Sequence, residues 1–392
     1  MIRKCKHVDI TDRAFIKKAI NECMSRKNQK KRCRKDIVNF YAECDNKEEN
    51  VITVLQTEIK ERKLKLIPIR YSERVDKSNG KIRTMAIESI KQQFYDYIAY
   101  DGLEELASCI GHYQIACKKK MGPVFGAHVI QEWMKDKNVR YGIKADVRKC
   151  YPSITHENVM KWLRKRVAND TLLWLIETLL ETFHEGLPIG SYLSIRLNAL
   201  YLSDIYHRCE DHYFVERRGK KQNVVAHVMI NLDDIYIFGS NAKAMNRMMR
   251  DLVSYAREEK NITIKETWTI INLNPKDENS HFDALGYRIY HDRITMRHRN
   301  YIKFRHAIKD FKKHRTVANA RNVISYDGMF RKHTNSTRFD RKYNVYMVVR
   351  KARRIISDYD KSKIPGQAAQ STDVFRIREH SLHDMPERQA VY

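Results

Sequence analysis

Three aspartates constrain this chain most, because each lies at the edge of an apolar segment, where an unpaired charge is costly. Asp146 ends the stretch 139–145, whose alternation of apolar and polar residues is typical of a β-strand. Asp233 and Asp234 separate two further apolar runs, 224–230 and 235–238, which predict a β-hairpin with the pair at its tip. The fold must therefore supply these partly buried carboxylates with a partner.

A divalent cation is the partner that fits best. Adjacent like charges repel each other unless a cation neutralises them. Mg²⁺ is commonly held by a few carboxylates together with substrate phosphates. Two such ions, roughly 3.5 to 4 Å apart, can activate a hydroxyl and stabilise a leaving group in nucleotidyl transfer. We therefore expect two Mg²⁺ ions, with Mn²⁺ as the alternative; for the aspartate pair read alone, a plain surface turn stays open.

The charge balance indicates a polyanionic partner. The 392 residues include 75 lysines and arginines against 48 acidic residues, a net charge of +27. These cations are spread along the chain among 22 tyrosines and 13 phenylalanines, which suits a surface that follows a nucleic-acid backbone. An anionic membrane surface is the competing interpretation. The apolar fraction of 42% is sufficient for a folded core.

Nothing in the sequence indicates export or membrane insertion. The eight cysteines form no C-x-x-C pair and no zinc-site spacing with histidines. The first nine residues are basic and polar, and no apolar run approaches the roughly 20 residues of a membrane span. We expect a cytoplasmic protein with reduced thiols and no membrane partner.

Local patterns predict helices at both ends of the chain and strands between them. Strands 66–70 and 81–85 should form a cation-bearing hairpin around the turn 76–80, followed by a helix over 87–106. Thr155 should cap the next helix, and a long helix should cover 191–210. A second hairpin is expected over 281–297, and basic helices over 300–360.

Five segments in order resemble motifs A to E of reverse transcriptases, especially those of bacterial retroelements. They are 144–154, 185–194, 231–234, 261–265 followed by Trp268, and 285–290. Within that family, the motif sequences are most similar to those of the diversity-generating and defence-associated enzymes. The resemblance implies an α+β right-hand polymerase fold. Its expected parts are a basic helical N-terminal extension (1–64), fingers (65–138), a palm with motifs A to D (139–280), a primer-grip hairpin (281–300), a basic helical thumb (301–363) and a C-terminal tail (364–392).

The resemblance also assigns roles at the catalytic centre. Asp146, Asp233 and Asp234 would be catalytic and would hold the metal ions, with the backbone carbonyl of Val147 as a further ligand. Tyr151 lies where the family places an aromatic gate that excludes a ribose 2′-hydroxyl. A plain core tyrosine is the alternative.

Further residues would contact the nucleotide and the primer. Gly186 and Gly190, around Pro188, allow close backbone approach, and Ser191 with the helix after it would support the nucleotide. Phosphate contacts are expected from four cations: Lys81, Arg83, Arg148 and Lys265. For the hairpin cations, simple solvation is equally open. The primer grip would contain Leu285, Gly286 and Tyr287.

Two departures from the family pattern bear on the biological role. Asn231 replaces the aromatic residue that usually begins motif C, and Ile195-Arg196 stands where the diversity-generating group has Gln. We therefore expect an RNA-directed DNA polymerase that makes cDNA from dNTPs on a noncoding RNA, in antiphage defence, with an accessory protein, a second polymerase or a homo-oligomer as further partners. Diversity generation is the alternative role, and a catalytically silent RNA-binding scaffold is the alternative of another class. Tyr151 disfavours an RNA polymerase.

Overall fold

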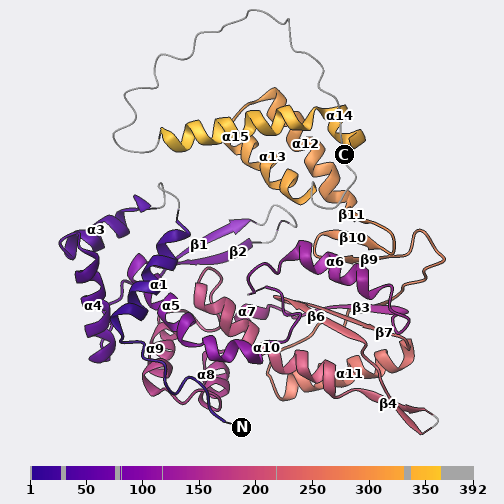
Figure 1. Ribbon diagram of the computed structural model, residues 1–392, viewed down its shortest axis with the longest axis horizontal. Coiled ribbons are helices and arrows are strands. Elements are labelled where there is room, and N and C mark those ends of the chain that lie inside the picture. The colour runs from indigo at the N-terminus through magenta and orange to yellow at the C-terminus, as the bar shows by residue number, and fades with distance from the viewer. Residues whose placement is uncertain are drawn as a thin grey trace, which may run out of the picture.

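A computed structural model describes residues 2–27, 32–75, 80, 82–116, 118–217, 219–330 and 337–362. Helices pack around antiparallel sheets, so the architecture is α+β. Figure 1 shows the N-terminal helices on one side, the largest sheet on the other, and a C-terminal helical bundle at one end.

The N-terminal segment is helical, as predicted. Its helices are α1 (Arg13–Ser25), α3 (Lys35–Glu43) and α4 (Glu48–Lys60). Asp12 begins α1 by accepting a hydrogen bond from the backbone N–H of Phe15 at 2.9 Å. The apolar face of α1 packs against α4 and against α5 (Ile90–Gly102), which ties this segment to the rest of the fold.

The first hairpin lies further along the chain than predicted. It pairs β1 (Arg70–Val75) with β2 (Ile82–Ile87), with Arg70 opposite Ile87. The predicted strand 66–70 is wrong over most of its length. Pro68 has no N–H to donate to a ladder, which explains why pairing begins after it. Residues 76–79 of the turn and Lys81 lie outside the described residues.

A four-stranded antiparallel sheet forms the centre, in the order β6-β7-β3-β8. Its strands are β3 (Tyr141–Asp146), β6 (His227–Asn231), β7 (Asp234–Gly239) and β8 (Thr269–Asn272). The predicted hairpin of β6 and β7 is confirmed. In the pairing of β3 with β7, Asp146 lies directly opposite Asp234.

The two faces of this sheet bury different side chains, as strand alternation requires. Ile143, Ile235 and Ile237 belong to the largest apolar core, together with residues of the two long helices α10 (Tyr192–Asp211) and α11 (Ala242–Glu258). Tyr236 and Phe238 face a second core, formed with α6 (Pro123–Trp133) and the small sheet described below. The sheet is thus covered on both sides.

The remaining elements of this region are short and pack around the large core. Thr155 caps α8 as predicted, its side-chain oxygen accepting from the N–H of Asn158 at 3.3 Å. The elements are η1 (Glu104–Cys109), α7 (Cys150–Ser153), α8 (His156–Arg164), α9 (Asp170–Glu181), β4 (Phe214–Arg217) and β5 (Lys220–Asn223).

The segment predicted as a hairpin over 281–300 is a three-stranded antiparallel sheet instead. It contains β9 (His281–Ala284), β10 (Tyr287–Tyr290) and β11 (Ile294–Met296), in the order β11-β10-β9. The two-stranded prediction missed a second turn, which the N–H of Tyr290 closes on the carbonyl of Arg293 at 2.8 Å.

The C-terminal helices form a bundle with an apolar core of its own. They are α12 (His298–Lys313), α13 (Val317–Phe330), α14 (Thr337–Tyr343) and α15 (Val345–Lys361). Phe304, Phe330 and Phe339 lie at the centre of that core. The predicted helical segment 301–363 therefore begins earlier, at His298, and the predicted tail 364–392 lies outside the described residues. No helix in the described parts of the chain is both long and apolar enough to cross a membrane.

Candidate active site

Backbone pairing holds the three aspartates together. The β3–β7 register sets Asp146 opposite Asp234, and the N–H of Val147 donates to the carbonyl of Asp233 at 2.9 Å. The turn between β6 and β7 is tight because Leu232 adopts a left-handed conformation with φ of 59°. The three carboxylates therefore start from adjacent positions at the ends of paired strands.

Each of these carboxylates lies in a distinct electrostatic setting. Burial raises the pKa of Asp233 above its ordinary value, the neighbouring Asp234 and Asp146 raise it further, and Arg83 opposes them. Asp146 forms an ion pair with Lys265, whose backbone N–H also donates to the Asp146 carbonyl at 2.9 Å. Asp234 accepts a hydrogen bond from the hydroxyl of Tyr236 at 2.8 Å.

The donor set fits a hard divalent cation, although its side chains do not converge as a finished metal site. Within the described ranges, no three or more His, Cys, Asp or Glu side chains are grouped so that they could hold a metal ion. Lys265 and Tyr236 instead occupy oxygens of Asp146 and Asp234. Even so, the donors are oxygen atoms, which a hard divalent cation prefers. Burial first, and then the charges of Asp234 and Asp146, raise the pKa of Asp233, and a bound cation would oppose both effects.

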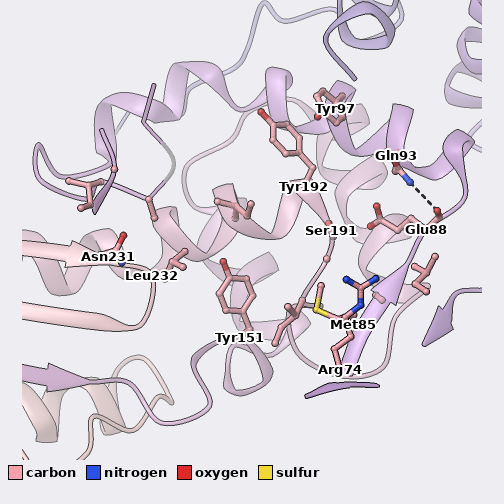
Figure 2. A pocket seen from close by; sticks show the side chains of 18 of the residues that line it. Arg74, Met85, Glu88, Gln93, Tyr97, Tyr151, Ser191, Tyr192, Asn231 and Leu232 are labelled. Carbon is pink, nitrogen blue, oxygen red and sulfur yellow. Dashed lines mark hydrogen bonds between the residues drawn. The ribbon is translucent and has the colours of Figure 1, made fainter. Parts of the chain in front are cut away.

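A cavity of about 900 Å³ opens beside the aspartates (Figure 2). Its lining combines residues from all the segments that resemble motifs A, B and C, among them Tyr151, Gly190 and Leu232. The side chain of Tyr151 lies between Leu232 and Met85 in this view. The cavity thus brings the predicted gate residue, the predicted motif B loop and the β2 strand around one space.

The motif B loop is fixed against β2 by close backbone contact. The N–H of Ala86 donates to the carbonyl of Ile189 at 2.9 Å. Gly190 has a φ of +124°, and a Cβ atom there would lie 2.5 Å from the carbonyl oxygen of Ala86. Only glycine fits this position without strain. The close approach here is to the protein's own β2 backbone, and the approach to a base pair or sugar stays a prediction.

The hydroxyl group of Ser191 forms hydrogen bonds within the protein. That hydroxyl donates to the Asp96 carboxylate at 2.5 Å and accepts from the N–H of Ser194, so that Ser191 caps α10. The same Asp96 oxygen accepts from the N–H groups of Tyr192 and Leu193 at 3.1 and 3.2 Å. Asp96 therefore anchors the first turn of the helix that follows motif B.

Asp96 and its neighbour Glu88 are site residues that the sequence analysis missed. Both are buried, and Glu88 lines the cavity. Burial is the main cause that raises the pKa of each carboxyl group, and for Glu88 the nearby Asp96 raises it further. A usable signal was the single acid within the apolar helical run 94–98.

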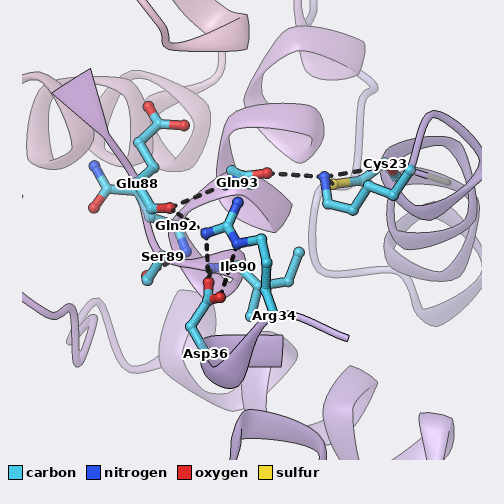
Figure 3. A network of polar contacts seen from close by, with 9 residues as sticks. Cys23, Arg34, Asp36, Glu88, Ser89, Ile90, Gln92 and Gln93 are labelled. Carbon is cyan, nitrogen blue, oxygen red and sulfur yellow. Dashed lines mark hydrogen bonds and ion pairs between the residues drawn. The ribbon is translucent and has the colours of Figure 1, made fainter. Parts of the chain in front are cut away.

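The N-terminal helices brace the same corner of the cavity (Figure 3). Arg34 forms a bidentate pair with Asp36 at 2.9 and 2.7 Å and also donates to the carbonyl of Glu88 at 3.1 Å. Gln93 donates to the same carbonyl at 3.0 Å and accepts from Lys27 at 2.8 Å. The junction of β2 and α5 forms one cavity wall. It is therefore held in part by N-terminal residues that precede the segments resembling motifs A to E.

The predicted phosphate-binding cations differ in their surroundings. Lys265 contacts Asp146, and the charge of Arg83 acts on Asp233 from the exposed surface of β2. Arg148 is exposed directly after Val147, and its N–H donates to the carbonyl of Thr263 at 2.8 Å. Lys81 lies outside the described residues.

The predicted primer-grip residues connect to the aspartates through one tyrosine. Leu285 and Gly286 form the turn between β9 and β10, with φ values of 56° and 90°. The N–H of Leu285 donates to the hydroxyl of Tyr236 at 3.4 Å, and that hydroxyl donates to Asp234. Tyr287 is buried, and its hydroxyl donates to the carbonyl of Met329 in the helical bundle at 3.2 Å.

Comparison with known proteins places this geometry in context. Residues 75–289, more than half of the chain, match the family model described as reverse transcriptase (RNA-dependent DNA polymerase). Among solved structures, the chain is similar to a telomerase from Candida albicans in complex with a TWJ fragment of telomeric RNA, at 11% identity and a TM-score of 0.42. That alignment covers 76% of this chain and 62% of the telomerase chain. No curated protein matches the chain.

Proposed function

Because the chain belongs to the reverse transcriptase (RNA-dependent DNA polymerase) family, we propose that it copies a noncoding RNA into cDNA by two-metal nucleotidyl transfer. Membership of the family also establishes the right-hand polymerase fold that the motifs predicted. The observation that carries the proposal is the strand register that sets Asp146 opposite Asp234, with Asp233 bonded to Val147.

We assign the parts of the hand from the observed elements. The fingers comprise 65–138, the palm 139–280 and the primer-grip sheet 281–296, and the helical bundle from His298 onward is the thumb. The N-terminal helices form an extension that supports the fingers, as the contacts of Arg34 and Lys27 with the β2–α5 junction suggest.

Divalent metal ions are general in this family, and here Asp146, Asp233, Asp234 and the Val147 carbonyl would hold two Mg²⁺ or Mn²⁺ ions. Such ions supply activation of the primer 3′-hydroxyl and stabilisation of the pyrophosphate. Lys265 contacts the carboxylate of Asp146, and Tyr236 contacts that of Asp234. Both side chains would have to release these carboxylates for metal ions to bind there.

The residues around the cavity position the nucleotide. Arg83, Arg148 and Lys81 would contact the triphosphate, where fixed positive charge assists phosphoryl transfer most. Lys265 would turn from Asp146 toward the leaving group. Tyr151 would exclude the 2′-hydroxyl, and Gly190 would allow the sugar and base to approach the backbone. Leu285, Gly286 and Tyr287 would hold the primer end.

For the biological role we favour antiphage defence over diversity generation. Two departures support this preference: Asn231 departs from the family's motif C, and Ile195-Arg196 departs from the diversity-generating pattern. The partners would be a noncoding RNA, its cDNA and dNTPs, together with an accessory protein, a second polymerase or a second copy of the chain. Sequencing the DNA product and the bound RNA distinguishes the roles, and a variable repeat next to the gene would point to diversification.

Primer extension with purified protein and its copurified RNA tests the activity. We expect dNTP incorporation that requires Mg²⁺ and disappears in an Asp233→Ala/Asp234→Ala variant. Equal incorporation by variant and wild type would overturn the polymerase proposal. If the wild type binds RNA tightly but extends no primer under any metal condition, the alternative of a silent RNA-binding scaffold is correct.

A further inference from the structure

A row of cations runs along the exposed face of α11, away from the catalytic cavity. Lys243, Arg247 and Arg250 are exposed and lie four and three residues apart, so their side chains share one face of the helix. The apolar side chains of α11 are buried on the opposite face, in the large core. Among the described residues that line the catalytic cavity, none belongs to α11. The row therefore has no part in the chemistry proposed above.

The positive charge of this row is not neutralised by the described part of the protein. None of its cations belongs to an ion pair there, whereas Arg257, further along the same helix, pairs with Glu266 at 3.2 Å. The nearby acid Asp251 is engaged by Arg208 at 3.0 Å and by the hydroxyl of Tyr213 at 2.6 Å. Like charges three or four residues apart destabilise a helix. A bound anion would relieve this repulsion.

The β4–β5 hairpin adds further cations beside this row. Figure 1 shows the hairpin extending from the body of the protein next to α11. The segment 217–221 contains four cations in five residues, and every side chain of β5 is exposed. The bond from Tyr213 to Asp251 ties the base of the hairpin to α11. The exposed cations of the helix and the hairpin together are called the α11 surface: Lys220, Lys221, Lys243, Arg247 and Arg250.

The α11 surface lies on the other side of the central sheet from the C-terminal bundle (Figure 1). α11 packs in the core that holds Ile235 and Ile237, whereas α6 and the sheet of β9, β10 and β11 cover the opposite face of the central sheet. The catalytic cavity reaches the turn at Leu232, at the end of β6 and β7. A polyanion bound at the α11 surface would therefore leave the catalytic cavity open.

The chemistry of this surface favours a partner that is bound through phosphates. Phe214 is the one large apolar side chain exposed among the described residues of the hairpin and α11, and Lys221 lies over its ring at 3.4 Å. An unpaired strand gains much of its affinity from bases stacked on aromatic rings, and a membrane-binding helix needs apolar side chains. A double helix keeps its bases paired inside and presents phosphates outward, so it matches this surface best.

We propose that the α11 surface binds a double-helical segment of the noncoding RNA and holds that RNA while its unpaired part is copied. This inference rests on the proposed polymerase function and adds a second binding site for the same RNA. The cations contact phosphates, which is how double-stranded RNA is mostly recognised, together with its shape and its 2′-hydroxyl groups. Such a tether raises the local concentration of the template at the catalytic cavity.

Matched variants separate this surface from the catalytic centre. Arg247→Gln/Arg250→Gln removes two cations of the row. Arg13→Gln/Arg164→Gln is the control, because it removes the same charge at two exposed arginines that are already paired with glutamates. The first change relieves repulsion between like charges, so it should not lower the thermal stability of the protein.

Nucleotide addition is measured on two RNA templates of equal length. One carries a stem of about 16 base pairs beyond an unpaired linker of about 20 nucleotides, and in the other the stem is replaced by unpaired sequence. We expect the stem to lower the KM for the template on the order of tenfold in the wild type and in the control, with kcat unchanged. Arg247→Gln/Arg250→Gln and Lys220→Gln/Lys221→Gln should each lose most of this advantage and match the wild type on the template without a stem.

Fluorescence anisotropy with the labelled stem alone measures binding without catalysis. For Arg247→Gln/Arg250→Gln, the slope of the logarithm of affinity against the logarithm of salt should fall by about 1.8, or roughly 0.9 for each lost phosphate contact. An unchanged slope would contradict the inference.

Three results in the extension assay would overturn the inference while leaving the polymerase intact: no advantage from the stem in the wild type, a full advantage in Arg247→Gln/Arg250→Gln, or an equal loss in the control. An equal advantage from a DNA stem would overturn the assignment to RNA. If the stem has no effect and the wild type, but not the variant, binds vesicles of phosphatidylserine and phosphatidylcholine, the surface binds a membrane instead. Absence of extension by the wild type on every template would reject the proposed function itself, and the anisotropy slope would still test the surface.

Discussion

Tyr151 offers a test of the catalytic cavity at the scale of one residue. Its carbonyl accepts from the N–H of Leu187 at 2.9 Å, so its position is tied to the motif B loop. Replacing it with alanine opens the cavity where the ribose 2′-hydroxyl would lie. We expect Tyr151→Ala to increase incorporation of rNTPs relative to dNTPs by about tenfold or more.

Competition between rNTPs and dNTPs in primer extension measures this ratio. Tyr151→Phe is the matched control, because it keeps the ring and loses only the hydroxyl, and it should select sugars as the wild type does. Unchanged selection in Tyr151→Ala would show that the residue is a core tyrosine.

Glu88 gives the second residue-scale prediction, which concerns pH. Burial raises its pKa, so its protonated form contributes stability that is full below the ordinary glutamate pKa and is lost as pH rises through the raised value. Glu88→Gln keeps a neutral side chain at every pH. The variant should therefore gain stability over the wild type between about pH 5 and pH 8, by at most about 1.4 kcal/mol per pH unit.

Urea unfolding at the two pH values measures this difference. Glu61→Gln at the exposed end of α4 is the matched control, because it makes the same substitution at a side chain that is not buried. If Glu88→Gln destabilises the protein equally at both pH values, the carboxyl group is not held in its neutral form.

The sequence identified those candidate site residues that stand out in a local pattern or motif. Asp146, Asp233 and Asp234 stood out because charges interrupt apolar strands, and Tyr151 because it lies where the resemblance places the gate. Their catalytic roles stay predictions. Glu88 and Asp96 were missed, since their burial depends on helices α5 and α10 meeting at Ser191. The contact of Asp96 with Ser191 joins residues 95 apart in the sequence, and the only local signal of it was the single acid within the apolar run 94–98.

At the scale of elements, Gly190 decides how closely the motif B loop can approach β2. Its φ of +124° and the nearby Ala86 carbonyl leave no room for a side chain. We expect Gly190→Ala to lower the free energy of unfolding by about 1 to 3 kcal/mol and to reduce nucleotide addition, because the loop must move away from β2.

Thermal unfolding and single-turnover extension measure the two effects. Gly122 lines the same cavity but has open space where a Cβ atom would lie, so Gly122→Ala is the matched control and should change little. Equal behaviour of both variants would mean that the loop and β2 tolerate separation.

The order of strands and helices was predictable, but their pairing was less so. The β6–β7 hairpin and the α10 helix follow directly from apolar spacing. The first hairpin was placed too early because its strand was assigned across Pro68. The segment predicted as the primer-grip hairpin has a third strand because of a second turn at Arg293. Both errors concern where backbone hydrogen bonds begin, which side-chain patterns define only within a few residues.

For the whole molecule, the arrangement of its parts depends on a few contacts between segments far apart in sequence. Tyr287 links the sheet of β9, β10 and β11 to the helical bundle through Met329, and Arg34 links the N-terminal helices to Glu88. Composition predicted a nucleic-acid partner, but it did not reveal which cations would lie beside a cavity, as Arg34 and Arg74 do.

The net charge of +27 leads to the last prediction, on salt dependence. If the protein contacts about six phosphates of a single-stranded RNA, binding releases the counterions of those phosphates. The logarithm of the binding affinity should then fall with the logarithm of the salt concentration at a slope of about −4. Between about 50 and 200 mM salt, the affinity should drop by a few hundredfold. Fluorescence anisotropy with a labelled RNA measures this slope. The Asp233→Ala/Asp234→Ala variant should keep it, because that variant removes no cation, whereas a nearly flat dependence would mean that base stacking rather than phosphate contact holds the RNA.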